Sequence, residues 1–200
     1  MKRLLLFVAL LACAGPVAAG NRAAEILGRL AEGFRTMKGY EVSFEIEAGE
    51  YRAGGSYAVE HEGYFLELGD AEVFCDGAVR YEVDNARREV TIVGVDTTSR
   101  NILNNPVRAF DFPGSDYAPE LVAEKDGRAV VRMNLTVGGD SAAGSVTVTV
   151  DTATMRPVAV DYDYEGERVH VSVSRVASLA APVRKFDPKR YEGYEFIDFR

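Results

Sequence analysis

The sequence predicts a mainly β fold with a few helices (α+β), in which a strongly curved antiparallel sheet forms an unclosed β-barrel under a helical lid. Apolar and polar side chains alternate along most of the chain, and each alternating run is short. The breaks between runs carry Gly, Asp or Asn, as in a meander of antiparallel strands. About ten such strands give a large sheet with one apolar face. The helical segments are too few to cover that face, so the sheet is expected to curl around an apolar hollow.

The chain begins with the pattern of a secretory signal peptide. Lys2 and Arg3 precede a short apolar run, and small residues precede a cleavage point after Ala19. The run is shorter than the about 20 residues that a transmembrane helix needs. We therefore expect residues 1–19 to be removed as a signal peptide and residues 20–200 to form a single exported domain.

An alternative for the same segment is a lipid anchor. The residues before Cys13 loosely resemble a lipobox, in which the cysteine is lipidated and becomes the new N-terminus. Leu11 is uncommon just before the small residue Ala12, and the signal would be very short. We expect cleavage after Ala19, and attachment through Cys13 is the other outcome.

Helical spacing of apolar residues follows from Asn21 to Met37, with charged residues on the other face. Asn21 is placed to cap the start of this helix and Gly39 to end it. The period then changes to that of strands. They are expected near residues 42–47, 57–59, 64–68, 73–75, 79–83, 90–92, 129–137, 146–150, 156–164 and 168–176.

Two irregular segments stand out among these strands. Asp76-Gly77 is the clearest hairpin signal in the chain. Residues 96–119 interrupt the alternation, with a short helix expected through Ile102 and Leu103 and a break at Asn104-Asn105-Pro106. We expect residues 96–119 to form a mobile cover over one side of the sheet, with a plain crossover loop as the alternative.

Charge and reactive residues argue against several functions. A net charge of −8 disfavours nucleic acid and anionic membranes as partners. After cleavage Cys75 is the only cysteine, so no intrachain disulfide can form. Its position in the alternating pattern predicts a buried, inert thiol. His61 and His170 lack neighbours at metal-ligand spacing, and His170 is expected on the solvated face. We expect no metal, no cofactor and no catalytic residues, with an exported hydrolase as the least supported alternative.

Several motifs, in this order, resemble the LolA-like outer-membrane lipoprotein carrier proteins. Residues 65–68 and 72–83 are similar to the central hairpin of that family, and Asn104-Asn105-Pro106 resembles its mid-chain Asn-Pro segment. Residues 186–188 and 193–200 resemble its closing Phe-rich strand and tail. The resemblance covers nearly the whole mature chain.

This resemblance implies a periplasmic carrier that buries lipoprotein acyl chains in a hydrophobic cavity. It also implies passage from an inner-membrane lipoprotein-releasing transporter to an outer-membrane acceptor. Such transfer needs no covalent chemistry, because exposed acyl chains already cost about 0.8 kcal/mol per CH₂ in water. The chain departs from the family at residues 60–63, where better-known members carry an Arg-Pro linked to lid closure, and at Tyr81, where they carry Trp. These differences indicate a divergent branch.

The candidate acyl-binding residues are the apolar positions that alternate toward the inside of the sheet, together with those of the cover. They are Phe44, Ile46, Tyr57, Leu66, Leu68, Val73, Tyr81, Val83, Ile102, Leu103, Phe110, Met133, Leu135, Val146, Val148 and Val160. The competing interpretation is that many of them fill a solid core. A second function is also open, that of a membrane-anchored lipid- or lipoprotein-binding sensor or acceptor domain of the same fold.

Overall fold

The computed structural model describes residues 16–97, 104–108, 110, 117–135, 144–164 and 166–200. Within them the chain forms one α-helix, twelve strands and two short 3₁₀ helices. In order they are α1 (Pro16–Arg35), β1 (Gly39–Ala48), β2 (Tyr51–Glu60), β3 (Gly63–Leu68), β4 (Ala71–Cys75), β5 (Val79–Asp84), β6 (Glu89–Gly94), η1 (Pro106–Arg108), β7 (Tyr117–Lys125), β8 (Arg128–Leu135), β9 (Ser145–Asp151), β10 (Arg156–Tyr164), β11 (Glu167–Ser178), η2 (Pro188–Tyr191) and β12 (Glu195–Asp198).

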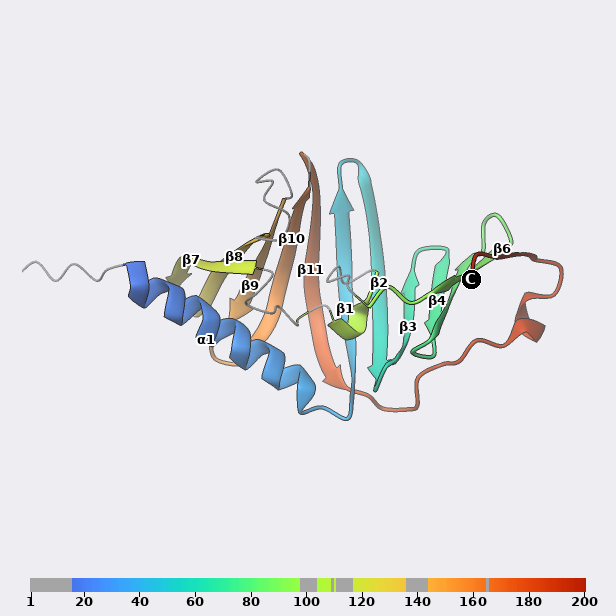
Figure 1. The fold of residues 1–200 in the computed structure, drawn as a ribbon, viewed down its shortest axis with the longest axis horizontal. Coiled ribbons are helices and arrows are strands. Elements are labelled where there is room, and N and C mark those ends of the chain that lie inside the picture. Colours follow the sequence, from blue (N-terminus) through green and yellow to red (C-terminus); the bar gives the residue numbers. More distant parts are fainter. Residues whose placement is uncertain (1–15, 98–103, 109, 111–116, 136–143, 165) are drawn as a thin grey trace, which may run out of the picture.

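All twelve strands belong to one sheet, in the order β12-β6-β5-β4-β3-β2-β1-β11-β10-β9-β8-β7. Neighbouring strands are antiparallel except β12, which runs parallel to β6. The sheet is curved and unclosed, because β7 and β12 lie at its opposite ends and do not pair with each other (Figure 1). The fold class predicted from the sequence is therefore confirmed.

Helix α1 covers part of one face of the sheet, which we call the inner face. It packs against β7, β8 and β10 (Figure 1). The helix buries an apolar stripe made of Ala23, Ile26, Leu27, Leu30 and Phe34. These side chains join the inward residues of the strands in one large cluster.

The bounds of α1 differ from the expected ones. The helix starts at Pro16, so the assignment of Asn21 as its N-cap is wrong, and it ends at Arg35 instead of Met37. Pro16 fits a first helical position, since the missing N–H of proline has no intrahelical partner there. Cleavage after Ala19 would remove the first residues of the helix, and it stays a prediction.

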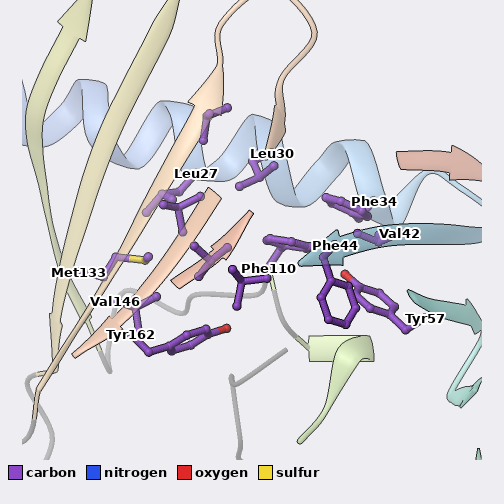
Figure 2. Close-up of a cluster of buried hydrophobic side chains, with 14 of the residues drawn as sticks. Leu27, Leu30, Phe34, Val42, Phe44, Tyr57, Phe110, Met133, Val146 and Tyr162 are labelled. Carbon is purple, nitrogen blue, oxygen red and sulfur yellow. The ribbon is translucent and has the colours of Figure 1, made fainter. Parts of the chain in front are cut away.

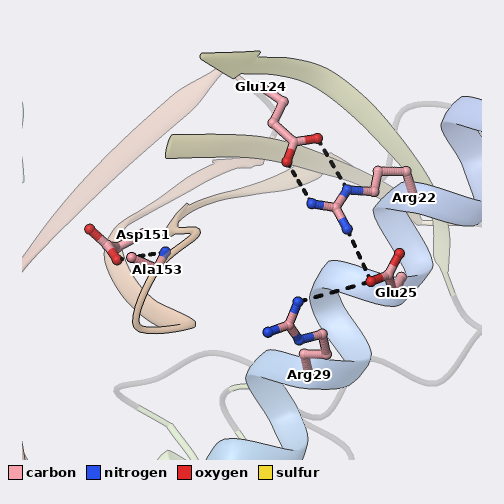
Figure 3. A network of polar contacts seen from close by, with 6 residues as sticks. All are labelled: Arg22, Glu25, Arg29, Glu124, Asp151 and Ala153. Carbon is pink, nitrogen blue, oxygen red and sulfur yellow. Dashed lines mark hydrogen bonds and ion pairs between the residues drawn. The ribbon is translucent and has the colours of Figure 1, made fainter. Parts of the chain in front are cut away.

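An ion pair joins the start of α1 to the far end of the sheet. The Arg22 guanidinium donates to both carboxylate oxygens of Glu124 on β7, at 3.1 and 2.6 Å (Figure 3). Its third nitrogen lies 3.0 Å from a Glu25 carboxylate oxygen one helical turn on. The two-pronged geometry fixes the direction of the helix across β7 more closely than a single contact would.

A second, smaller core lies on the outer face of β3–β6. It is formed by Phe65, Phe74, Val83, Val90 and Tyr191, with Tyr81, Ile92, Val183, Phe186 and Tyr194 packed around them. The C-terminal segment 183–194 crosses that face before β12 joins the edge at β6. Phe186 stacks between two rings, 4.2 Å from that of Tyr81 and 5.4 Å from that of Tyr191. The chain thus covers the outer face at this end with its own aromatic residues.

Glu72 is the polar centre of this second core. Its carboxylate accepts hydrogen bonds from the Tyr191 hydroxyl at 2.8 Å, from Arg184 at 2.9 Å and from the Asn85 amide at 3.4 Å. Burial acts to raise the pKa of Glu72, but these hydrogen bonds and the charge of Arg184 outweigh it and lower the pKa. The ionised carboxylate therefore links β4 to the C-terminal segment.

Strand β7 was missed by the sequence reasoning, which extended the irregular segment to residue 119. Pro119 interrupts the alternating pattern, and the register against β8 shifts between Leu121 and Ala123. A proline is compatible with a strand only at an edge or a bulge, and β7 is the last strand of the sheet.

The Asp76-Gly77 hairpin is confirmed, since Asp76 accepts hydrogen bonds from the N–H groups of Ala78 and Val79.

Phe186→Ala is expected to lower the free energy of unfolding by about 2 kcal/mol, because it removes two stacked ring pairs and half-buried apolar area. Chemical denaturation measures this loss. Phe199→Ala is the matched control, since Phe199 is 70% exposed in the same tail, and it should change stability by less than about 0.5 kcal/mol. Equal losses for the two variants would contradict the packing role of Phe186.

Glu72→Gln should destabilise the protein in a pH-dependent way. The lowered pKa means that ionised Glu72 stabilises the fold fully above the unfolded value of about 4.3, and that this contribution is lost as the pH falls through the folded pKa. We expect a loss of about 1–2 kcal/mol near pH 7 and a smaller one near pH 3, from denaturant titrations. Glu67→Gln, at a more exposed carboxylate, serves as control. A loss that is independent of pH would refute this account.

Candidate ligand-binding site

A pocket of about 1050 Å³ opens between the C-terminal end of α1, the β2–β3 turn and the described part of the predicted cover. We call it the mouth pocket. Its apolar lining consists of Ala31, Phe34, Met37, Tyr40, Val59, Val107 and Phe110. Its polar lining consists of Arg35 and Lys38 at the end of the helix and Glu60, His61 and Glu62 at the turn. The volume lies slightly above the range of about 300–1,000 Å³ that is typical of small-molecule sites.

Three aromatic rings that line the mouth pocket contact one another. The Phe110 ring, from the cover, stacks on that of Phe34 of α1 with centroids 4.5 Å apart and planes 12° apart. Tyr40 of β1 meets Phe34 edge-on at 4.8 Å. Figure 2 shows Phe34 and Phe110 on the inner side of the sheet, near Phe44 and Tyr57. The cover therefore contacts the helix as well as the strands.

Three side chains of the sheet hold the backbone of the cover. The Asn104 carbonyl accepts hydrogen bonds from Arg80 at 2.7 Å and from the Tyr64 hydroxyl at 3.2 Å. The Pro106 carbonyl accepts one from the Tyr40 hydroxyl at 3.3 Å. Residues 104–106 of the cover therefore lie on the inner face. The arginine that donates to the backbone of the cover is Arg80 on β5. Residues 60–63 contain no arginine.

Most of the candidate acyl-binding residues come together in the inner cluster. Those buried there are Phe44, Ile46, Tyr57, Leu66, Val73, Phe110, Met133, Val146, Val148 and Val160. Leu68 is partly buried and packs against them. Ile102, Leu103 and the side chain of Leu135 lie outside the described residues. Their role in acyl binding stays a prediction.

Tyr81 and Val83 were assigned to the wrong face. The β4–β5 register pairs Tyr81 with Phe74 and Val83 with Glu72, so both residues point to the outer face and join the second core. The error arose from carrying the phase of Val73 and Cys75 through the Asp76-Gly77 turn. The observed register pairs the inward residues Cys75 and Val73 of β4 with Arg80 and Glu82, so these two residues occupy the inward positions of β5.

The inner cluster is filled with side chains in this state. Tyr57, Met133 and Val146 are each at most 1% exposed (Figure 2). Among the described candidates only Phe110 lines the mouth pocket. The other apolar lining residues were missed as site residues, although a signal existed, because Phe34 and Met37 continue the stripe of the predicted helix. Tyr40 likewise lies just before a predicted strand, and Val59 lies at the end of another.

Cys75 and His170 lie on opposite faces of the sheet. Cys75 is buried, as expected, and burial raises the pKa of its thiol. His170 lies on the outer face with its Nδ1 2.6 Å from an Asp161 oxygen, in a polar hollow that Arg132 and Arg168 also line. Within the described ranges, no three or more His, Cys, Asp or Glu residues are grouped so as to hold a metal ion. In that same part of the chain, no helix is both long and apolar enough to cross a bilayer.

No protein-family model and no curated protein matches the chain. Solved structures do. An uncharacterized conserved protein from Thermus thermophilus is 9% identical, with a TM-score of 0.56, over 88% of this chain and 99% of that protein. MucB is 18% identical, with a TM-score of 0.54, over 82% of this chain and 61% of MucB. A LolA superfamily protein from Nitrosomonas europaea is 12% identical, with a TM-score of 0.40, over 80% and 94% of the two chains.

At such low identity the first two similarities show a shared fold alone. This chain spans less than two thirds of the MucB chain. The unclosed, curved sheet with its helix is the architecture that the sequence resemblance implied. The chain therefore shares its fold with MucB and the Thermus thermophilus protein, and this fold agrees with the unclosed, curved sheet that the resemblance to the LolA-like carriers implied.

Proposed function

We propose that this protein is a periplasmic carrier that binds the acyl chains of lipoproteins in its apolar interior and delivers them toward the outer membrane. The observation that carries the proposal is the mouth pocket, which opens beside a continuous apolar cluster under a cover. The cover is held by hydrogen bonds to its backbone from Tyr40, Tyr64 and Arg80. Binding of this kind requires no catalytic residue and no cofactor.

The energies favour opening of the cover by an acylated ligand. Breaking the three hydrogen bonds described between the sheet and the cover and exposing the Phe110 ring costs about 4–9 kcal/mol. Burying an acyl chain of roughly 15 methylenes gains at most about 12 kcal/mol at about 0.8 kcal/mol each, since the side-chain contacts that it displaces reduce this gain. A ligand with a long chain can therefore open the interior, whereas a small polar solute gains too little to do so.

The partners that follow from this proposal are acylated lipoproteins, an inner-membrane lipoprotein-releasing transporter and an outer-membrane acceptor. The sequence resemblance supports these partners. The polar residues around the mouth pocket supply both charges, with Arg35 and Lys38 opposite Glu60 and Glu62. The protein part of a bound lipoprotein, which stays outside the pocket, would contact these residues of both charges.

A second candidate function is an anchored lipid- or lipoprotein-binding sensor or acceptor domain. Cys13 favours it, because a lipidated Cys13 would hold the protein at a membrane. The similarity in fold to MucB, which has been solved in complex with MucA(peri), is compatible with a partner protein in place of a shuttled cargo.

Val107→Asp should weaken lipid binding by at least about tenfold, because it places a carboxylate in the apolar lining of the mouth pocket. Two measurements check this: titration with a fluorescent acyl probe, and release of a diacylated lipoprotein from membranes. Val122→Asp is the matched control, since Val122 is 44% exposed on β7, and it should bind as the unchanged protein does. Failure of the unchanged protein to bind the probe or release the lipoprotein would refute the proposed function.

Labelling with radioactive palmitate separates the two candidate functions. A free carrier, cleaved after Ala19, should incorporate no label. An anchored sensor or acceptor should incorporate label that Cys13→Ala abolishes. Label in the unchanged protein that disappears in the variant would contradict the free shuttle and support the anchored domain.

A further inference from the structure

The Tyr57 hydroxyl is a buried polar group without a partner. Tyr57 is 1% exposed, and among the described residues no atom lies in hydrogen-bonding position to its hydroxyl. The neighbouring tyrosines of the inner face differ, since Tyr40 and Tyr64 both donate to backbone carbonyls of the cover. An unmet hydroxyl in an apolar interior costs free energy, and a phenylalanine would fill the same place without that cost.

The hydroxyl acts as a hydrogen-bond donor in this setting. Burial raises the pKa of Tyr57 far above its ordinary value, with smaller contributions from Tyr40 and Tyr162, so the group stays protonated. Around it the surface is apolar and aromatic, with the Phe44 ring centroid 6.0 Å away (Figure 2). A ligand that brings an acceptor into these apolar surroundings would satisfy its O–H.

Tyr57 lies one ring behind the mouth pocket. Tyr40 lines that pocket, and its ring meets the Tyr57 ring edge-on at 6.2 Å. Beyond Tyr57, on β2, the buried apolar residues continue across β1, β11, β10 and β9 to Met133 on β8. At about 4.8 Å per strand this path is about 24 Å long. An acyl chain spans half of a bilayer core of about 30 Å, or about 15 Å, so the path is long enough for one chain that displaces side-chain contacts along it.

We propose that the Tyr57 hydroxyl donates a hydrogen bond to the carbonyl at the head of an acyl chain whose methylenes extend along this path. This inference rests on the proposed function and adds a selectivity to it. The protein recognises the carbonyls of acyl chains, in esters or amides. It binds lipids that have the same hydrocarbon chains but no carbonyl less tightly.

The test compares an ester-linked phospholipid with its ether-linked analogue, which has the same chains and headgroup but lacks the carbonyls. We expect the unchanged protein to bind the ester about five- to tenfold more tightly, as one buried hydrogen bond allows. Tyr57→Phe should bind both lipids with equal affinity. Repeating the pair with an ester-linked and an ether-linked diacylated lipopeptide shows whether a lipoprotein or a free phospholipid supplies the preferred carbonyl.

Tyr40→Phe is the matched control. It removes a hydroxyl that has a partner, the Pro106 carbonyl, so it should change the affinity for both lipids by the same factor and leave the ester preference intact. Thermal unfolding of ligand-free Tyr57→Phe should show no loss of stability, because no hydrogen bond is removed.

The outcomes keep this inference apart from the proposed function. Equal binding of ester and ether by the unchanged protein overturns the role of Tyr57 and leaves lipid binding standing. An ester preference that survives in Tyr57→Phe also overturns it. Failure to bind any of the lipids overturns both proposals.

Discussion

Coverage of the inner apolar face is the constraint on which the rest of this structure depends. A twelve-stranded open sheet exposes a long apolar surface, and α1 packs only on strands at the β7–β10 end. The remaining surface, around β1–β3, is met by the cover, whose η1 contacts β2 and β3. The mouth pocket lies where the helix ends and the cover begins. Its position therefore follows from a helix that is too short for the sheet.

The two faces of the sheet are closed by different forces. On the outer face, stacked rings and the Glu72 carboxylate join the C-terminal segment to β4 and β5, and the apolar atoms there contact one another directly. On the inner face, the described contacts of the cover include hydrogen bonds to the Asn104 and Pro106 carbonyls and the stacked ring of Phe110. Hydrogen bonds to a backbone exchange for water when a segment lifts, so these contacts can be broken and remade without separating stacked rings.

Sequence reasoning recovered what depends on local periodicity. Strand alternation located most of the sheet, and ten of the candidate residues lie buried in one cluster. It failed where the phase had to be carried across a turn, as at Tyr81, or where a proline hid an edge strand, as at Pro119. The unmet hydroxyl of Tyr57 could not be predicted, because hydrogen-bond satisfaction depends on neighbours far apart in the chain, such as Asn104 and Pro106 for the adjacent tyrosines.

The filled interior bears on release as much as on binding. An empty chamber would keep the whole gain of about 0.8 kcal/mol per methylene for the ligand. Here Phe110 and its neighbours already occupy the apolar space, so a bound chain replaces contacts between protein side chains. The net affinity is therefore the difference between two similar apolar environments plus any polar bond, and a carrier needs such a moderate value to hand its cargo on. A single hydrogen bond from Tyr57 then has a disproportionate influence on which lipid is retained.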